Sequence, residues 1–234
     1  MMRRRCWFGP LLAACSLCCA TDEEIGLSES SWPEDEDVVD HGALDQSLAP
    51  EPASCASRWE PSSAALALGE LQVVPYEGAG SRCSGGAAQG ALELASYLRE
   101  HFSALIDRRI PGDGIQIYNC RQVRGGQSLS LHATGRALDV FIPLVGGRAN
   151  NASGDVIANW LVANAWRIGV QFIVWDRTRW KASGPSPRYR CYTGENPHIE
   201  HIHLELTRAA AERRTLFFQG EAPVEVPPPA PPAW

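Results

Sequence analysis

Residues 130–142 read Ser-Leu-His-Ala-Thr-Gly-Arg-Ala-Leu-Asp-Val-Phe-Ile, a polar turn sequence that runs into β-forming residues. From Arg136 onward the stretch alternates in polarity and becomes rich in β-branched and aromatic side chains, which favour a strand. Asp139 is therefore predicted to lie on a strand, a short distance along the chain from His132. Together they offer one imidazole and one carboxylate to a common site.

A second polar cluster, Glu200-His201-Ile202-His203, opens a short apolar stretch. Catalytic zinc typically takes three N and O ligands and leaves a position for water, whose proton a nearby carboxylate removes. His132, Asp139 and His203 are the predicted ligands, and Glu200 is the predicted base. On a strand, His201 and His203 would share one face. A rival ligand set of His132, His201 and His203, with Asp139 hydrogen-bonded to a ligating imidazole, stays open.

Hydrophobic periodicity predicts a mixed α and β chain. Apolar residues recur at intervals of three and four from Ala87 to Ile110, as on one face of a helix. Ser153 is the predicted N-cap of a second helix, and Gly169 its predicted stop. The predicted helices span 87–110 and 154–167, and the predicted strands span 71–75, 115–118, 136–142, 170–175, 189–192 and 201–206.

The two clusters together resemble a known signature. The pattern Ser130-x-His132-x-x-Gly135-x-Ala137-x-Asp139, followed by Glu200-x-x-His203, is similar to that of the zinc D-alanyl-D-alanine peptidases, the VanX-like dipeptidases and VanY-like carboxypeptidases. The resemblance covers roughly residues 114–207. It implies an α+β domain of the Hedgehog/D-Ala-D-Ala peptidase type, with an antiparallel sheet bearing zinc and helices on the other side. It also implies His132, Asp139 and His203 as zinc ligands and Glu200 as general base.

The resemblance further implies an arginine that stabilises the oxyanion. Arg121 stands in that place, although its context, Tyr118-Asn119-Cys120-Arg121, departs from the commoner Ser-Gly-Tyr-Arg. Arg124 is a rival for the same role. Some extensin-like proteins share the Cys-Arg and His-x-x-Gly-x-Ala-x-Asp patterns without a well-defined activity.

The function implied is zinc-dependent hydrolysis of a peptide bond in peptidoglycan, in stem peptides or crosslinks. Carboxypeptidase, dipeptidase and endopeptidase activities all stay open. The alternative is a non-catalytic, zinc-stabilised module that binds cell wall or a protein partner. A carboxylate such as Glu200 beside open zinc favours catalysis over that alternative. We expect a monomer, and no basic run indicates nucleic-acid binding.

The N-terminus has the pattern of an export signal. Three Arg in residues 1–5 precede an apolar or small stretch from Cys6 to Ala20, which is shorter than a membrane span. Leu12-Ala13-Ala14-Cys15 resembles a bacterial lipobox, so Cys15 is a candidate lipid-bearing residue, with an ordinary signal cleaved after Ala20 as the alternative. Either leads to an exported protein, in the periplasm or cell envelope and attached to a membrane only through the lipid, or otherwise secreted.

Composition divides the rest of the chain. Residues 21–57 contain eleven Asp or Glu and no Lys or Arg, which predicts an acidic disordered tether. A folded domain over 58–218 and a Pro-rich tail over 219–234 follow. Export permits disulfides, and the four cysteines beyond the signal allow three pairings, among which the sequence does not choose. They are Cys55, Cys83, Cys120 and Cys191.

Overall fold

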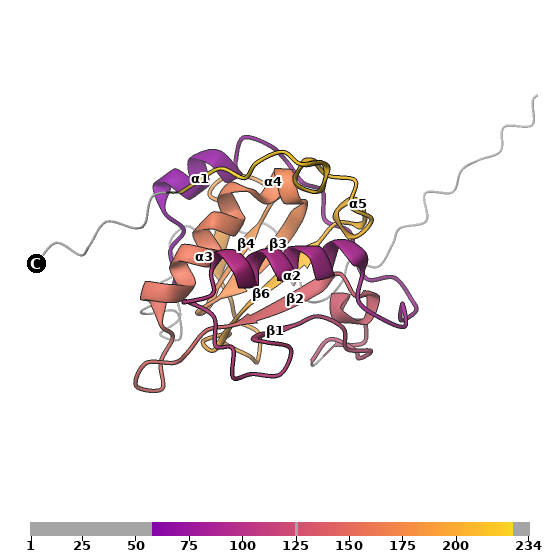
Figure 1. Ribbon diagram of the computed structural model, residues 1–234, viewed down its shortest axis with the longest axis horizontal. Helices are drawn as coiled ribbons and strands as arrows, with labels where there is room; N and C mark the ends of the chain where they lie inside the picture. Colours follow the sequence, from indigo (N-terminus) through magenta and orange to yellow (C-terminus); the bar gives the residue numbers. More distant parts are fainter. Residues whose placement is uncertain (1–57, 125, 227–234) are drawn as a thin grey trace, which may run out of the picture. The chain divides into compact units, whose positions relative to one another are not determined.

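The computed structural model of the chain describes residues 58–124 and 126–226. Its centre is one antiparallel sheet of six strands in the order β1-β2-β6-β3-β4-β5 (Figure 1). The mixed α and β class and the antiparallel sheet predicted from the sequence are thereby confirmed. The strands are β1 (Ile115–Gln116), β2 (Ala137–Phe141), β3 (Val170–Trp175), β4 (Thr178–Lys181), β5 (Tyr189–Cys191) and β6 (His201–Leu206).

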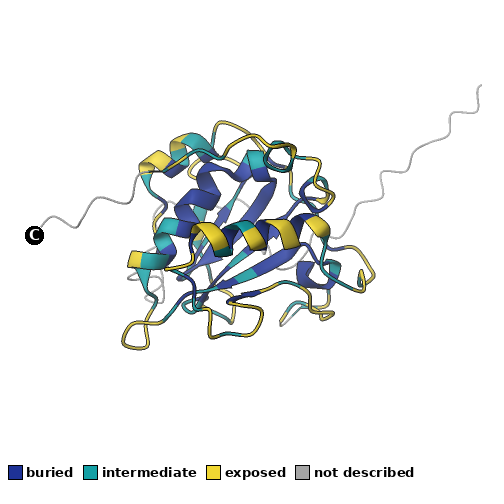
Figure 2. Cartoon of the chain, in the orientation of Figure 1, coloured by how far each residue is buried: buried dark blue, intermediate teal, exposed yellow. Residues whose placement is uncertain are grey.

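The helices gather over one face of this sheet, where α2 and α3 cross it (Figure 1). Each turns buried residues toward the strands, and α2 exposes its outer side (Figure 2). The helical elements are α1 (Ser63–Gly69), α2 (Gln89–His101), η2 (Leu131–Thr134), α3 (Asn151–Ala163), α4 (Ala165–Ile168), α5 (Arg208–Ala211) and η3 (Leu216–Gln219).

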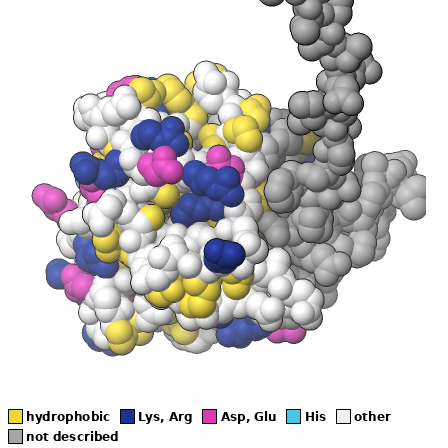
Figure 3. Space-filling view, turned by 90° about the vertical axis from the view of Figure 1, so that its right-hand side faces the viewer, with side chains coloured by type: hydrophobic (Ala, Val, Ile, Leu, Met, Phe, Trp, Pro, Cys, Tyr) yellow, Lys and Arg dark blue, Asp and Glu magenta, His cyan; other side chains and the backbone are white. Residues whose placement is uncertain are grey.

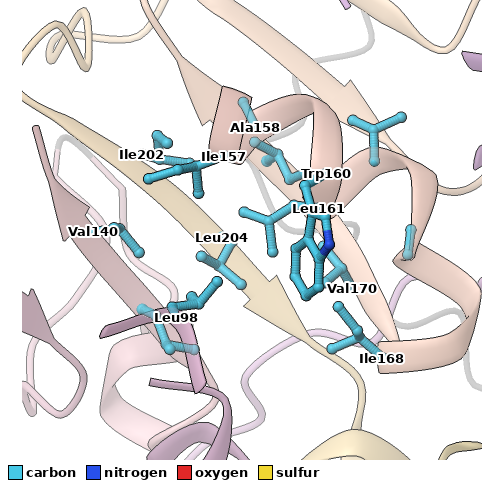
Figure 4. Packing of buried hydrophobic residues seen from close by; sticks show 14 of the residues in the cluster. Leu98, Val140, Ile157, Ala158, Trp160, Leu161, Ile168, Val170, Ile202 and Leu204 are labelled. Carbon is cyan, nitrogen blue, oxygen red and sulfur yellow. The ribbon is translucent and has the colours of Figure 1, made fainter. Parts of the chain in front are cut away.

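Alternation along the strands separates a core face from a polar face. On β6, Ile202 and Leu204 join the core beneath the helices, where they meet Leu161 of α3 and Val140 of β2 (Figure 4). Side chains at alternate positions point to the opposite face. On β6 that face carries His201, His203 and Glu205, so both polar clusters of the sequence reach the side of the sheet that the helices leave open.

Two predicted strands match the structure residue for residue, namely 170–175 and 201–206. Gly169, at φ 87°, ends α4 as expected, but the predicted helix 154–167 is divided at Asn164 into α3 and α4. The predicted helix 87–110 is shorter and ends at His101. Beyond it, Ile106 reaches the core from a series of turns, and Asp107 N–H donates to Phe141 O at the sheet edge, 2.8 Å away. The apolar spacing of residues 87–110 therefore continues past the last turn of α2.

The structure contradicts two local predictions. Ser153 is not an N-cap, because α3 already begins at Asn151 and Asn150 O accepts from Ser153 N–H. Residues 71–75 form no strand. The Gln72 carbonyl accepts from the Arg188 guanidinium, 2.8 Å away, instead of from a neighbouring strand. Both segments have the right composition, but their hydrogen bonds go elsewhere.

The described C-terminal residues stay on the domain beyond residue 218. The Asn164 amide exchanges two hydrogen bonds with the backbone of Val224, at 2.7 and 2.9 Å. Val226 then packs against the core. The predicted signal and tether over 1–57, with Cys15, lie outside the described residues, as do positions 227–234 of the predicted tail.

A disulfide joins Cys83 to Cys120 and thereby fastens the loop before α2 to the segment after β1. Cys191 is disulfide-bonded as well, and Cys55 lies outside the described residues. On the face in Figure 3, basic and acidic side chains lie beside one another, so that face has mixed charge. Within the described ranges, no helix combines the length and apolar character that crossing a membrane requires.

Candidate metal centre

His132 is presented by a capped turn. Ser130 Oγ accepts from His132 N–H, 3.3 Å away, at the start of η2, and Gly135 closes the turn in the left-handed region at φ 67°. A Cβ on Gly135 would lie 2.4 Å from Gly86 O, so both conformation and space require glycine. The turn passes directly into β2, which brings Asp139 to the same face.

The pairing of β2 with β6 completes the cluster, because Asp139 lies directly opposite His203. His132 Nε2 is 3.2 Å from Asp139 Oδ1 and 3.2 Å from His203 Nδ1. Asp139 Oδ1 and His203 Nδ1 are 2.9 Å apart. Tetrahedral zinc with bonds of about 2.0–2.1 Å separates its ligand atoms by roughly 3.3 Å. The predicted triad of His132, Asp139 and His203 is therefore assembled, and these groups could hold a metal ion.

The hydrogen bonds behind the imidazoles suit such an ion. His132 Nδ1 donates to Ile117 O at 2.5 Å, and because a carbonyl only accepts, a neutral His132 keeps a lone pair on Nε2. His203 Nε2 lies 3.3 Å from Glu205 Oε1, which leaves Nδ1 toward the cluster. The lone pair of His132 and the carboxylate of Asp139 thus converge on a point that calls for positive charge. Either a proton on His203 or a metal ion can supply it.

Ionisation in the cluster follows from the same contacts. Burial alone would raise the pKa of Asp139, but the imidazoles of His132 and His203 that face its carboxylate outweigh this and hold the pKa well below its usual range. Burial alone would lower the pKa of His203, but hydrogen bonds to Asp139 and Glu205 raise it to about 10. A metal ion would take the place of that proton, as metal binding to histidine generally does.

Glu200 lies just before β6, where its carbonyl accepts from Ile142 N–H, 2.9 Å away. Its carboxylate oxygen Oε1 lies 3.2 Å from His201 Nδ1, an ion pair when that imidazole is protonated, and this contact, against the effect of burial, lowers the pKa of Glu200 to about 2. His201 Nε2 lies 3.6 Å from Asp139 Oδ1. His201 therefore stands between the predicted base and a predicted ligand, farther from Asp139 than either triad histidine.

His198 is also part of this cluster. It is buried at φ 51°, and its Nδ1 donates to Asn196 O, 2.5 Å away. Burial, reinforced by the nearby His203 and His201, lowers the pKa of His198 to about 3. A neutral imidazole therefore lies beside the candidate ligands. The spacing His198-x-x-His201-x-His203 is the signal in the sequence for this grouping.

A cavity of about 350 Å³ opens beside the triad and is lined by two of its members, Asp139 and His203. Arg121 and Arg124 both line it, together with Glu200 and Tyr192. Arg121 O accepts from Ser130 N–H at 3.1 Å, which keeps its segment beside the η2 turn, while its guanidinium donates to Gln122 O. The cavity thus brings the two rival arginines to the same space as the triad.

Glu205 is the site residue that sequence reasoning missed. The alternation of His201, His203 and Glu205 on one strand was the available signal, since every second residue shares a face. Its carboxylate lines the cavity and contacts His203.

Comparison with known proteins gives one family. The family model described as "VldE, C-terminal domain" matches residues 84–203, just over half of the 234 residues. The match includes the triad together with Glu200 and Arg121. No curated protein and no solved structure was found to match the chain. The match covers more than half of the chain, so the chain belongs to the VldE C-terminal domain family.

Proposed function

We propose that this protein is a zinc-dependent peptidase that hydrolyses peptide bonds in the stem peptides or crosslinks of peptidoglycan. The observation that carries the proposal is the convergence of His132 Nε2, Asp139 Oδ1 and His203 Nδ1 beside a cavity that is lined by Asp139, His203 and Glu200. The resemblance to D-alanyl-D-alanine peptidases supplies the substrate class. The Hedgehog-type fold is part of the same proposal, supported by a sheet with helices on one face and the cluster on the other.

Zinc is the metal that the donor set favours, because two imidazoles and one carboxylate are a common set at catalytic zinc. When bound, zinc would polarise the scissile carbonyl and lower the pKa of the attacking water. His132, Asp139 and His203 would hold it.

Glu200 would accept the proton of the attacking water and pass it to the leaving amine. Its depressed pKa of about 2 keeps it ionised at neutral pH, which is the form that accepts a proton. Arg121, or its rival Arg124, would donate hydrogen bonds to the developing oxyanion. Loss of one such donor typically lowers kcat by about 10²–10³.

The same ion pair favours one alternative. A carboxylate held by His201 at a pKa near 2 is a weak base, since general bases work best with a pKa near the operating pH. A zinc-stabilised module that binds cell wall or a protein partner without turnover is therefore the second candidate. Export to the cell envelope and a monomeric state are proposed for either.

The test is release of D-Ala or cleaved stem peptide from purified peptidoglycan by the zinc-loaded full chain. We expect Glu200→Gln to keep zinc and lose at least about 10²-fold in rate, because the base is removed while the ligands remain. Glu212→Gln is the matched control, because Glu212 is an exposed glutamate that pairs with Arg214 at 2.6 Å and does not line the cavity. Zinc binding without any product from the wild type would support the binding module.

A further inference from the structure

Glu205 combines burial with an incomplete set of hydrogen bonds. It is only 7% exposed, and its Oε1 lies 3.3 Å from His203 Nε2. Its other oxygen, Oε2, is buried and accepts no hydrogen bond from any residue in the described ranges. A buried carboxylate oxygen without a partner is unfavourable for folding. The fold therefore retains a group that its own stability does not require.

The neighbours of Glu205 on the sheet make the carboxylate more unfavourable. Ala137 of β2 and Phe172 of β3 lie opposite it on either side, and both are buried. An apolar residue would suit this position better, because it would pack between two apolar neighbours with no polar atom to satisfy. The hydrogen-bonding contact of Glu205 within the described ranges is with His203, and that contact explains a glutamate here; the charge of Arg136 acts on it as well.

His203 needs an acceptor that the backbone cannot give. His132 has the carbonyl of Ile117 behind its ring, because that residue lies beyond the end of β1. His203 lies on β6, between β2 and β3, where the backbone groups are used in strand pairing on both sides. Only a side chain on the same face can reach its outer nitrogen, and the residue two positions along the strand shares that face.

We propose that Glu205 is a positioning residue for the metal. Its carboxylate accepts a hydrogen bond from His203 Nε2–H, which fixes the tautomer and ring orientation that turn Nδ1 toward Asp139 and His132. Outer partners of this kind hold metal-ligating histidines in many proteins, and their loss typically weakens metal affinity by about 10–100-fold. The inference rests on the metal-binding part of the proposed function and not on peptidase activity.

The experiment measures Zn²⁺ affinity of the full chain by competition with a chelator. We expect Glu205→Leu to weaken the affinity by about 10–100-fold. Glu205→Asp should do the same, because the shorter side chain withdraws the carboxylate from Nε2 while it keeps the charge, and it provides the answer if the leucine variant does not fold. Glu205→Gln should lose less, since its amide oxygen can still accept.

Two further readouts separate positioning from a general structural role. In ¹⁵N-histidine spectra of the zinc form, the His203 Nε2–H proton should be protected from exchange in the wild type and lose that protection in Glu205→Leu. Zn²⁺ should also raise the unfolding temperature of the leucine variant by less than it raises that of the wild type, because ligand stabilisation follows affinity. A structural role alone would lower the unfolding temperature equally with and without Zn²⁺.

Asp155→Asn is the matched control, because it also replaces a partly buried carboxylate, here by an amide, but lies away from the triad, against Trp175. It should leave Zn²⁺ affinity unchanged. Wild-type affinity in folded Glu205→Leu and Glu205→Asp would overturn the inference and leave the proposed function standing. If the wild type binds no zinc, the proposed function itself fails.

Discussion

At the scale of single residues, the position of His201 favours one of the two ligand sets that the sequence left open. Its Nε2 lies 3.6 Å from Asp139 Oδ1, against 2.9 Å for His203 and 3.2 Å for His132. We therefore expect His201→Gln to bind one zinc per chain, and His203→Gln to lose more than the roughly 100-fold expected for an outer partner. Metal content after dialysis measures both. An equal loss of zinc in the two variants would restore the rival set.

At the scale of elements, the η2 turn carries His132 and depends on Gly135. Alanine there would adopt φ 67° with its Cβ 2.4 Å from Gly86 O and 2.6 Å from Ala88 N. Strain and overpacking together should lower the free energy of unfolding by about 2–4 kcal/mol. Urea denaturation of the metal-free protein measures this.

Gly80→Ala is the control for that substitution. Gly80 has φ 84° but no neighbour within 4 Å of an added Cβ, so only the conformational cost of about 1 kcal/mol applies. Equal losses in the two variants would mean that the contact of Gly135 with the loop before α2 contributes nothing.

The same scale shows what the sequence could predict. β3 and β6 were found to the residue because their apolar runs are bounded by turns, at Gly169 and just before His201. The triad was found because its residues stand in a spaced motif. β4 and α1 were missed, since Thr178–Lys181 alternates over only four residues and pairs by a tight turn whose Asp176 and Arg177 lack the usual glycine.

Long-range contacts explain the other differences. Residues 71–75 have the composition of a strand, yet the Gln72 carbonyl accepts from Arg188, more than a hundred positions away in the chain. In the sequence, Glu205 is one polar residue of an alternating strand. Its burial between Ala137 and Phe172 follows only from the pairing of β6 with β2 and β3. Local pattern contains neither partner, so composition alone could not have identified these roles.

At the scale of the whole molecule, stability should depend on pH through Asp155, a group remote from the triad. Burial raises the pKa of Asp155, hydrogen bonds from Trp175 and Asn151 partly offset this, and the charge of Asp176 adds to it. The folded protein therefore favours the protonated acid. That contribution is present below the unfolded pKa near 3.8 and is lost as pH rises through the higher folded pKa.

Asp155→Asn should remove this dependence. An asparagine Oδ1 can still accept from Trp175 Nε1 and Asn151 Nδ2, so the variant should be more stable than the wild type at pH 7, by up to about 1.5 kcal/mol. The difference should shrink as pH falls toward 4, because the wild-type acid then becomes neutral. Thermal unfolding of both metal-free proteins across this range measures it. A difference that grows on acidification would mean that Asp155 is stabilised as the anion, and the hydrogen bonds from Trp175 and Asn151 would then outweigh its burial.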